Sequence, residues 1–118
     1  KIGNVQKGYA LLLGLVFLVI GIWGFFTEDV LGVFDVNTSH NVVHVVFGLL
    51  GIYAGTKGKG KGYNGSVGWI YGILGVLGFV PGAKVILEQL LYVNAATNGL
   101  HLVIGIVSLG VFYSAKSS

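Results

Sequence analysis

The sequence predicts an all-α fold: an integral membrane four-helix bundle built as a tandem two-helix repeat. Three observations predict it, namely the composition, four uncharged segments and a polar motif that occurs twice. Of the 118 residues, 54% are hydrophobic and 9% are charged, whereas soluble domains carry about a quarter charged residues. A chain this short cannot bury so much apolar surface in a core of its own. We therefore expect residues 1–118 to form a single membrane domain surrounded by the lipid bilayer.

The composition also conflicts with several classes of function. The chain has no cysteine, which excludes disulfides, thiolate metal sites and cysteine nucleophiles. It has seven lysines and no arginine, so nucleic-acid binding is not indicated. The sequence contains no catalytic triad, phosphate-binding loop or metal-ligand spacing, and we expect neither enzymatic activity nor a bound metal ion. No methionine stands at position 1, and we expect that the chain begins after processing or after a disordered start.

The first predicted span covers residues 8–27, which carry no charge. A helix of about 20 apolar residues crosses a hydrocarbon layer of about 30 Å. A cleaved signal peptide is the alternative, but residues 23–26 (WGFF) do not form a small-residue cleavage site. An acidic connection over residues 28–35 follows, and the second predicted span covers residues 36–56.

The second half of the chain begins with a basic loop over residues 57–61, in which lysines alternate with helix-breaking glycines. The third predicted span covers residues 62–83. Residues 84–92 are predicted to form a short helix at the membrane surface, with its charged residues paired one turn apart. The fourth predicted span covers about residues 97–113.

The distribution of charge predicts the orientation of these spans. Six of the seven lysines fall on one side of the predicted membrane, and the seventh falls with all four acidic residues on the other side. The six are Lys1, Lys7, Lys57, Lys59, Lys61 and Lys116. Because cytoplasmic segments carry the excess of lysine, we expect both termini and the Lys57–Lys61 loop to be cytoplasmic, in a bacterial inner, plasma or thylakoid-type membrane.

The pattern V-N-x-x-x-N-x-x-H-x-V-x-G occurs twice, first from Val36 and again from Val93. On a helix its asparagines, histidine and glycine fall on one stripe. Gly21 and Gly78 have the same spacing as the two copies, which indicates that the repeat extends over both spans of each half. We therefore expect repeats at about residues 8–56 and 62–115, related by a pseudo-two-fold axis along the membrane normal. Such an axis brings the second and fourth spans together.

The first hypothesis for the paired stripes is an interhelical hydrogen-bond clamp, because a polar side chain in hydrocarbon needs a partner. The residues of this polar cluster are Asn37, Asn41 and His44 on one span and Asn94, Asn98 and His101 on the other. Asn37 and Asn94 also stand where N-caps are expected. Small residues on the same spans are predicted to let the helix backbones approach. They are Gly48, Gly51, Gly105 and Ser108.

The second hypothesis is a cofactor site. His44 and His101 would be the axial ligands of a b-type haem, or one of them would ligate the magnesium of a chlorophyll. Gly48 and Gly105 follow one turn later and would leave room for a flat macrocycle.

The third hypothesis is a proton or small-solute conduit along His44 and His101, with His40 extending the path outward. No carboxylate lies within any predicted span, and proton pumps use such acids. Thr97 replaces His40 in the second copy of the motif. We therefore expect His40 to be a local surface residue rather than a ligand.

Two segments resemble a small bacterial four-span family of unknown function, domain-of-unknown-function family 4383. The first is residues 34–44 followed by residues 47–51, and the second is residues 93–101 followed by Gly105. The resemblance implies the four-span fold over most of the chain, and it implies no activity.

These observations lead to one expected function and one alternative. We expect a non-catalytic accessory subunit that docks on a larger membrane complex, respiratory or photosynthetic, with lipid and other membrane subunits as its partners and without a cofactor. The alternative is a haem- or chlorophyll-binding membrane subunit that uses His44 and His101 as ligands.

Overall fold

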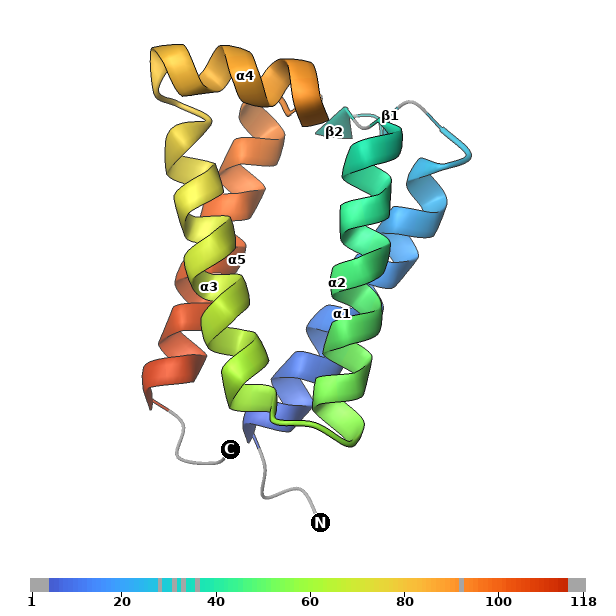
Figure 1. Cartoon of the computed structure of the whole chain (residues 1–118), viewed down its shortest axis with the longest axis vertical. Helices are drawn as coiled ribbons and strands as arrows, with labels where there is room; N and C mark the ends of the chain where they lie inside the picture. Colours follow the sequence, from blue (N-terminus) through green and yellow to red (C-terminus); the bar gives the residue numbers. More distant parts are fainter. Residues whose placement is uncertain are drawn as a thin grey trace.

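The computed structural model describes residues 5–27, 29–30, 32, 34–35, 37–91 and 93–114. Five helices make up almost all of this part of the chain, which confirms the all-α prediction (Figure 1). They are α1 (Val5–Gly24), α2 (Thr38–Thr56), α3 (Gly60–Leu77), α4 (Pro81–Leu91) and α5 (Ala95–Ser114). Two short strands, β1 (Asp29–Val30) and β2 (Phe34–Asp35), pair antiparallel in the connection between α1 and α2. The predictions for Lys1, Glu28, Val36, Tyr92 and Lys116 lie outside the described residues.

The long helices form two pairs. Helix α1 packs along α2, helix α3 packs along α5, and α1 and α3 make the main contact between the pairs. Helix α4 lies across one end of the molecule, and the α2–α3 connection, the start of α1 and the end of α5 lie at the opposite end (Figure 1).

The third predicted span was too long. Residues 62–83 do not form one helix, because α3 ends at Leu77 and the chain turns by 113° before α4 begins. Pro81 is the first residue of α4, where its missing N–H costs no helical hydrogen bond. The predicted short helix therefore exists, and it begins at Pro81 rather than at Lys84.

Glycines let the helices of each pair approach backbone to backbone. A Cβ atom added to Gly48 on α2 would lie 2.6 Å from the backbone nitrogen of Leu18 on α1. A Cβ atom added to Gly105 on α5 would lie 2.5 Å from the backbone nitrogen of Gly72 on α3. Both separations are too short for any side chain, so both crossings require glycine. Contacts of this kind hold helices together where lipid removes the hydrophobic drive.

Equivalent positions in the two helix pairs are not all separated by the same number of residues. Gly48 and Gly105 are as far apart in the sequence as the two copies of the repeated motif. The residues that they contact, Leu18 and Gly72, are separated by fewer residues. Gly21 of α1 accordingly occupies the position in its helix pair that Gly75 of α3, and not Gly78, occupies in the other. Cβ atoms at Gly21 and Gly75 would lie 3.1 and 3.0 Å from the matching backbone oxygens of Asn41 and Asn98. The connection within the second pair is correspondingly longer, and it includes α4.

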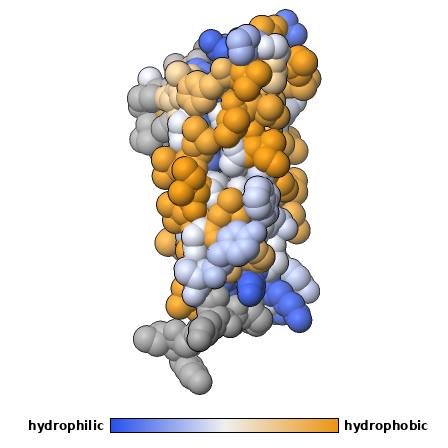
Figure 2. Space-filling view, turned by 90° about the vertical axis from the view of Figure 1, so that its left-hand side faces the viewer, coloured by the Kyte–Doolittle hydropathy of each residue, from blue (hydrophilic) through white to orange (hydrophobic). Residues whose placement is uncertain are grey.

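Many polar residues are buried and many large apolar residues are exposed, which is unlike the arrangement in soluble proteins. Nine described polar residues are buried, among them three histidines and several amide side chains on the long helices. They are Gln6, His40, Asn41, His44, Asn64, Thr97, Asn98, His101 and Ser108. Figure 2 shows the side of α3 and α5, where hydrophobic residues cover most of the middle and hydrophilic residues lie toward both ends.

Two helices of the described chain, α1 and α5, are long and apolar enough to cross a membrane. A third span results if α3 and α4 are counted together as one bent segment. These lengths and the apolar exterior are compatible with a membrane protein.

Candidate functional site

All three histidines of the chain meet in the interior, below α4. His40 and His44 come from α2 and His101 comes from α5, and each is 3–5% exposed. One ring nitrogen of each histidine lies within 4.8 Å of one ring nitrogen of each of the others. The expectation that His40 is a surface residue was therefore wrong, because the side chain is buried among the other two imidazoles.

The starts of α2 and α5 explain this placement. Asn37 Oδ1 accepts a hydrogen bond from the His40 backbone N–H (2.9 Å), and Asn94 Oδ1 accepts one from the Thr97 backbone N–H (2.9 Å). Both predicted N-caps are thus confirmed. His40 and His44 stand one turn apart, so one face of α2 carries both rings. Thr97 takes the corresponding place on α5, where its hydroxyl donates to Asn94 Oδ1.

Aromatic rings border the histidines on the side away from α4. Phe17 of α1 stacks on His44, with ring centroids 5.5 Å apart, and Tyr71 of α3 lies 5.0 Å from His101. Phe17 and Tyr71 also stack on each other at 5.1 Å. These two residues have the same sequence spacing as Leu18 and Gly72. Each helix pair therefore supplies one aromatic ring and one histidine beside it to the centre.

Helix α4 closes the other side of the cluster. His40 Nδ1 lies 2.9 Å from the carbonyl oxygen of Leu91, the last residue of α4. A carbonyl oxygen only accepts hydrogen bonds, so Nδ1 carries the hydrogen and Nε2 keeps a free lone pair. Asn37 Nδ2 donates to the carbonyl oxygen of Leu90 (2.9 Å). These two bonds tie the end of α4 to the start of α2.

Several polar atoms in the centre are buried without partners. Neither ring nitrogen of His101 has a hydrogen-bond partner among the described residues, and neither does the Tyr71 hydroxyl. A cavity of about 10 Å³ lies among the three histidines and the residues around them. Its walls are His40, Val43, His44, Tyr71, Leu74, Leu91 and His101.

The asparagines of the two stripes do not reach each other. Asn98 Nδ2 donates to the carbonyl oxygen of Gly78 at the end of α3 (2.9 Å). Asn41 lies against Gly24 of α1, and a Cβ atom added to Gly24 would overlap Asn41 Oδ1. Each of these two asparagines therefore contacts the partner helix of its own pair. Within the described part of the chain, His44 and His101 are the predicted cluster residues that are seen to meet across the two pairs.

A different set of polar residues links the pairs at the opposite end of the molecule. Asn64 Nδ2 donates to both the backbone oxygen and Oε1 of Gln6 (2.9 Å each), and Gln6 Nε2 donates to the Val111 carbonyl oxygen (2.8 Å). Tyr9 Oη and Ser108 Oγ lie 2.7 Å apart in a hydrogen bond. The sequence reasoning missed this network, although Asn64 is an isolated amide within an uncharged segment.

A family model matches residues 7–113, which include both helix pairs and nearly all of the residues above. The chain belongs to the DUF4383 family. The family is described as a domain of unknown function, so membership supports the resemblance seen in the sequence and assigns no activity. Comparisons with curated proteins and with solved structures find no match.

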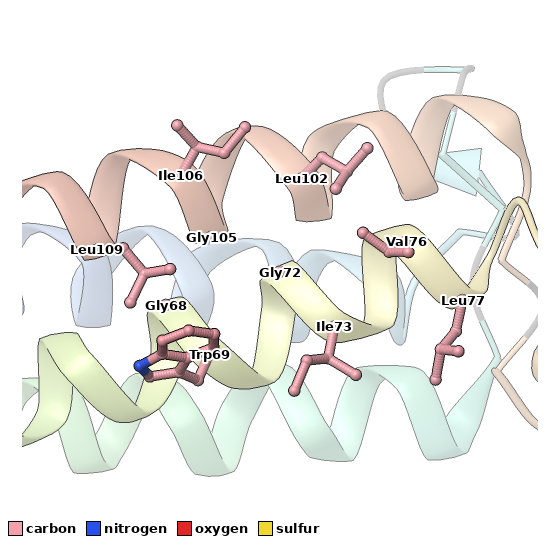
Figure 3. A pocket seen from close by; sticks show the side chains of 10 residues that line it. All are labelled: Gly68, Trp69, Gly72, Ile73, Val76, Leu77, Leu102, Gly105, Ile106 and Leu109. Atoms are coloured by element: carbon pink, nitrogen blue, oxygen red, sulfur yellow. The ribbon is translucent and has the colours of Figure 1, made fainter.

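The DUF4383 chain also carries an open groove on the outer side of α3 and α5. Its volume is about 410 Å³, and its lining is apolar. Figure 3 shows Gly68, Gly72 and Gly105 between the two helices, with larger side chains such as Trp69 and Ile106 to either side. A Cβ atom at Gly72 would meet nothing nearer than Gly105 Cα at 4.0 Å.

The other helix pair differs at the matching position. Leu18 stands on α1 where Gly72 stands on α3. An isobutyl side chain therefore projects from α1 at the place where α3 leaves open space.

Proposed function

We propose that this chain is a non-catalytic integral membrane protein of four spans that acts as an accessory subunit of a larger membrane complex. The four spans are α1, α2, α3 and α5, arranged as two like pairs about a pseudo-two-fold axis along the membrane normal. The matched glycine contacts of Gly48 and Gly105 support this repeat. The longest dimension of 43 Å suits a bilayer of about 40–45 Å including its headgroups.

Helix α2 is less hydrophobic than α1 and α5 because it carries the polar stripe. That stripe is buried, since His40, Asn41 and His44 all face the interior. The outward residues of α2 are apolar and exposed, namely Val42, Val46, Leu49 and Leu50. The helix therefore presents hydrocarbon to lipid in spite of its composition, which supports its assignment as a span.

The lysines at the ends of the helices support the predicted orientation of the chain in the membrane. Lys7 Nζ donates to the Thr56 carbonyl oxygen (3.4 Å), so the start of α1 lies beside the end of α2 and its basic loop. We propose that this end is cytoplasmic, as the excess of lysine favours. Helix α4 would then lie at the outer surface of the membrane.

The groove between α3 and α5 is the observation that carries the accessory role. Gly72 lies half-buried on its floor with open space at the Cβ position, whereas Gly68 and Gly105 are buried beneath it in the α3–α5 contact. A small residue at such a position lets a further helix pack closely in lipid. We propose that the occupant is a transmembrane helix of the partner complex. Its contacting residues would be apolar, because the groove offers no polar group for recognition. The matching face of α1 and α2 carries Leu18 at this position and would be the lipid-facing side.

The geometry gives less support to the haem or chlorophyll alternative. A cavity of about 10 Å³ holds one ion or water and no macrocycle. Gly48 and Gly105, which would have made room for a ring, lie against the backbones of α1 and α3. The conduit hypothesis also lacks a specific supporting contact, because Phe17 and Tyr71 stack across the centre below the histidines.

The docking proposal is tested with a pair of glycine variants. Gly72→Leu fills the groove with the side chain that α1 carries at the matching position. Gly110→Leu is the matched control, since a Cβ atom at Gly110 on α5 also meets nothing within 4 Å and Gly110 does not line the groove. Membranes of the native host expressing each tagged form are solubilised in mild detergent and run on a native gel.

We expect the natural chain and Gly110→Leu to migrate in a large assembly and Gly72→Leu to migrate as a small free species. Migration of the natural chain as a free species would reject the accessory role. Equal migration of all three forms in the assembly would place the contact elsewhere than the groove. A natural chain that migrates only as a dimer, which Gly72→Leu converts to a monomer, would reject the accessory role and identify a second copy as the occupant.

A further inference from the structure

We propose that His40, His44 and His101 bind one first-row transition-metal ion that prefers nitrogen ligands, namely zinc or copper. The three residues come from two helices of different pairs, so the ion would join the two halves of the bundle at its centre. The groove lies on the outside and the histidine cluster lies in the interior, and they use different residues. The two proposals therefore fail independently.

The separation of the ring nitrogens suits an ion with a small adjustment. Ligand nitrogens about 2.0–2.1 Å from zinc lie about 3.4 Å from one another in tetrahedral geometry. The three nitrogens already lie within 4.8 Å of one another. Rotations of the imidazole rings that bring the nitrogens together by up to about 1.4 Å would complete the arrangement.

The ring of His40 is already held in the orientation that a ligand needs. Metal-bound histidines nearly always donate their second ring N–H to a carboxylate, a backbone carbonyl or water. His40 Nδ1 donates to the Leu91 carbonyl oxygen, which leaves the Nε2 lone pair for an ion. The carbonyl belongs to the end of α4, and the partial negative charge of a helix C-terminus stabilises a nearby cation.

The atoms without partners also point to a missing ligand. A buried polar group without a hydrogen bond costs about 1–3 kcal/mol, and His101 has two such nitrogens within the described part of the chain. An ion bound to one of them offsets this cost. The cavity between the rings measures about 10 Å³, which is near the minimum for a single water or ion. Tyr71, whose hydroxyl has no partner among the described residues, lines the same cavity.

The ligand set defines the class of ion. Neutral imidazole suits zinc, copper, nickel and iron, whereas magnesium and calcium require oxygen ligands. The cluster found among the described residues contains three imidazoles and no carboxylate. Magnesium is therefore the appropriate negative control.

The experiment uses the full chain, purified in detergent, stripped with a chelator and then equilibrated with zinc, copper(I) or magnesium. We expect one zinc or copper ion per chain by elemental analysis, no magnesium, and an unfolding temperature that rises with zinc or copper concentration. Whichever of zinc and copper(I) binds more tightly is identified as the metal of the site. His101→Phe should weaken binding at least about 100-fold, which is the upper end of the loss for residues that only orient a ligand. Asn98→Ala, which leaves all three imidazoles in place, should keep it.

X-ray absorption spectroscopy of the natural chain loaded with zinc or copper tests the proposal without any variant, so its result does not depend on whether His101→Phe folds. We expect about three imidazole nitrogens in the first coordination shell. Oxygen-only coordination, binding of magnesium with equal affinity, or zinc binding that survives His101→Phe would overturn the proposal. A chain that retains no metal after equilibration would also overturn it and would leave a single ordered water as the occupant of the cavity.

Discussion

The α1–α2 pair and the α3–α5 pair share their glycine contacts and differ at the positions that face the centre and the groove. Gly48 and Gly105 make equivalent backbone contacts, whereas Phe17 matches Tyr71 and His40 matches Thr97. The shared residues set how the helices cross. The differing residues give the centre its third histidine and Tyr71 in place of phenylalanine, and they place Gly72 in the groove where the first pair carries Leu18. The proposed metal site therefore combines two matched histidines, His44 and His101, with His40, which the second half lacks.

The largest expected effect falls on the shared contacts. Gly48→Leu and Gly105→Leu each force apart two backbones, and overpacking of this kind costs about 3 kcal/mol or more where no side chain can yield. Unfolding titrations in mixed micelles measure the loss. Gly110→Leu, with open space at the Cβ position, should lose almost nothing. If one of the two buried glycines tolerated leucine, the pairs would not be equivalent.

The next effect concerns the amide network that links the pairs. Asn64→Ala gives α3 the residue that α1 carries at the matching position, Ala10, and removes the two hydrogen bonds that Asn64 Nδ2 donates to Gln6. We expect a loss of about 1–2 kcal/mol in the free energy of unfolding, measured by the same titration. Ser66→Ala is the control, since the exposed Ser66 hydroxyl bonds within its own helix. A loss no greater than that of Ser66→Ala would show that the network does not hold the pairs together.

A smaller effect, of opposite sign, is expected at the centre. Tyr71→Phe makes the second pair resemble the first and removes a buried hydroxyl that has no partner among the described residues. In metal-free protein we expect the free energy of unfolding to stay level or rise by about 1 kcal/mol. A clear destabilisation of the metal-free variant would mean that the hydroxyl has a protein partner.

The smallest effect is expected for Gly72→Leu on stability. The added side chain enters open space, so the free energy of unfolding should change by no more than about 0.5 kcal/mol. Thermal unfolding of the isolated chain in detergent checks this. A large loss would show that Gly72 is needed for the α3–α5 crossing, and the groove variant would then no longer separate docking from folding.

Much of the fold could be predicted from local pattern. The uncharged segments predicted the long helices, and Asn37 and Asn94 predicted two helix starts, because an N-cap acts within its own turn. The register of α1 against α3 was predicted incorrectly, since the spacing that relates Gly21 to Gly78 holds only for α2 and α5. The segment Lys7-Gly8-Tyr9 recurs as Lys61-Gly62-Tyr63, and this second repeat carries the spacing that relates α1 to α3.

The candidate site was harder to predict, because its partners are distant in the sequence. The repeated motif singles out His44 and His101, but His40 has no counterpart in the second copy. Its burial depends on α4, whose last carbonyl groups accept from His40 and Asn37. Asn41 fills space that is free because Gly24 has no side chain. A residue pattern shows which side chains are polar, and the packing of other helices decides what they contact.

The meeting of the three imidazoles across the two helix pairs can be measured without any variant. The chain contains three histidines, so histidine-selective labelling places isotope only in this cluster. Solid-state NMR of the labelled chain in lipid bilayers should show ring-to-ring cross-peaks linking His40 to His44 and to His101, whose ring centroids lie 4.4 and 6.0 Å from that of His40. A His101 signal without a cross-peak to either of the other rings would contradict the account.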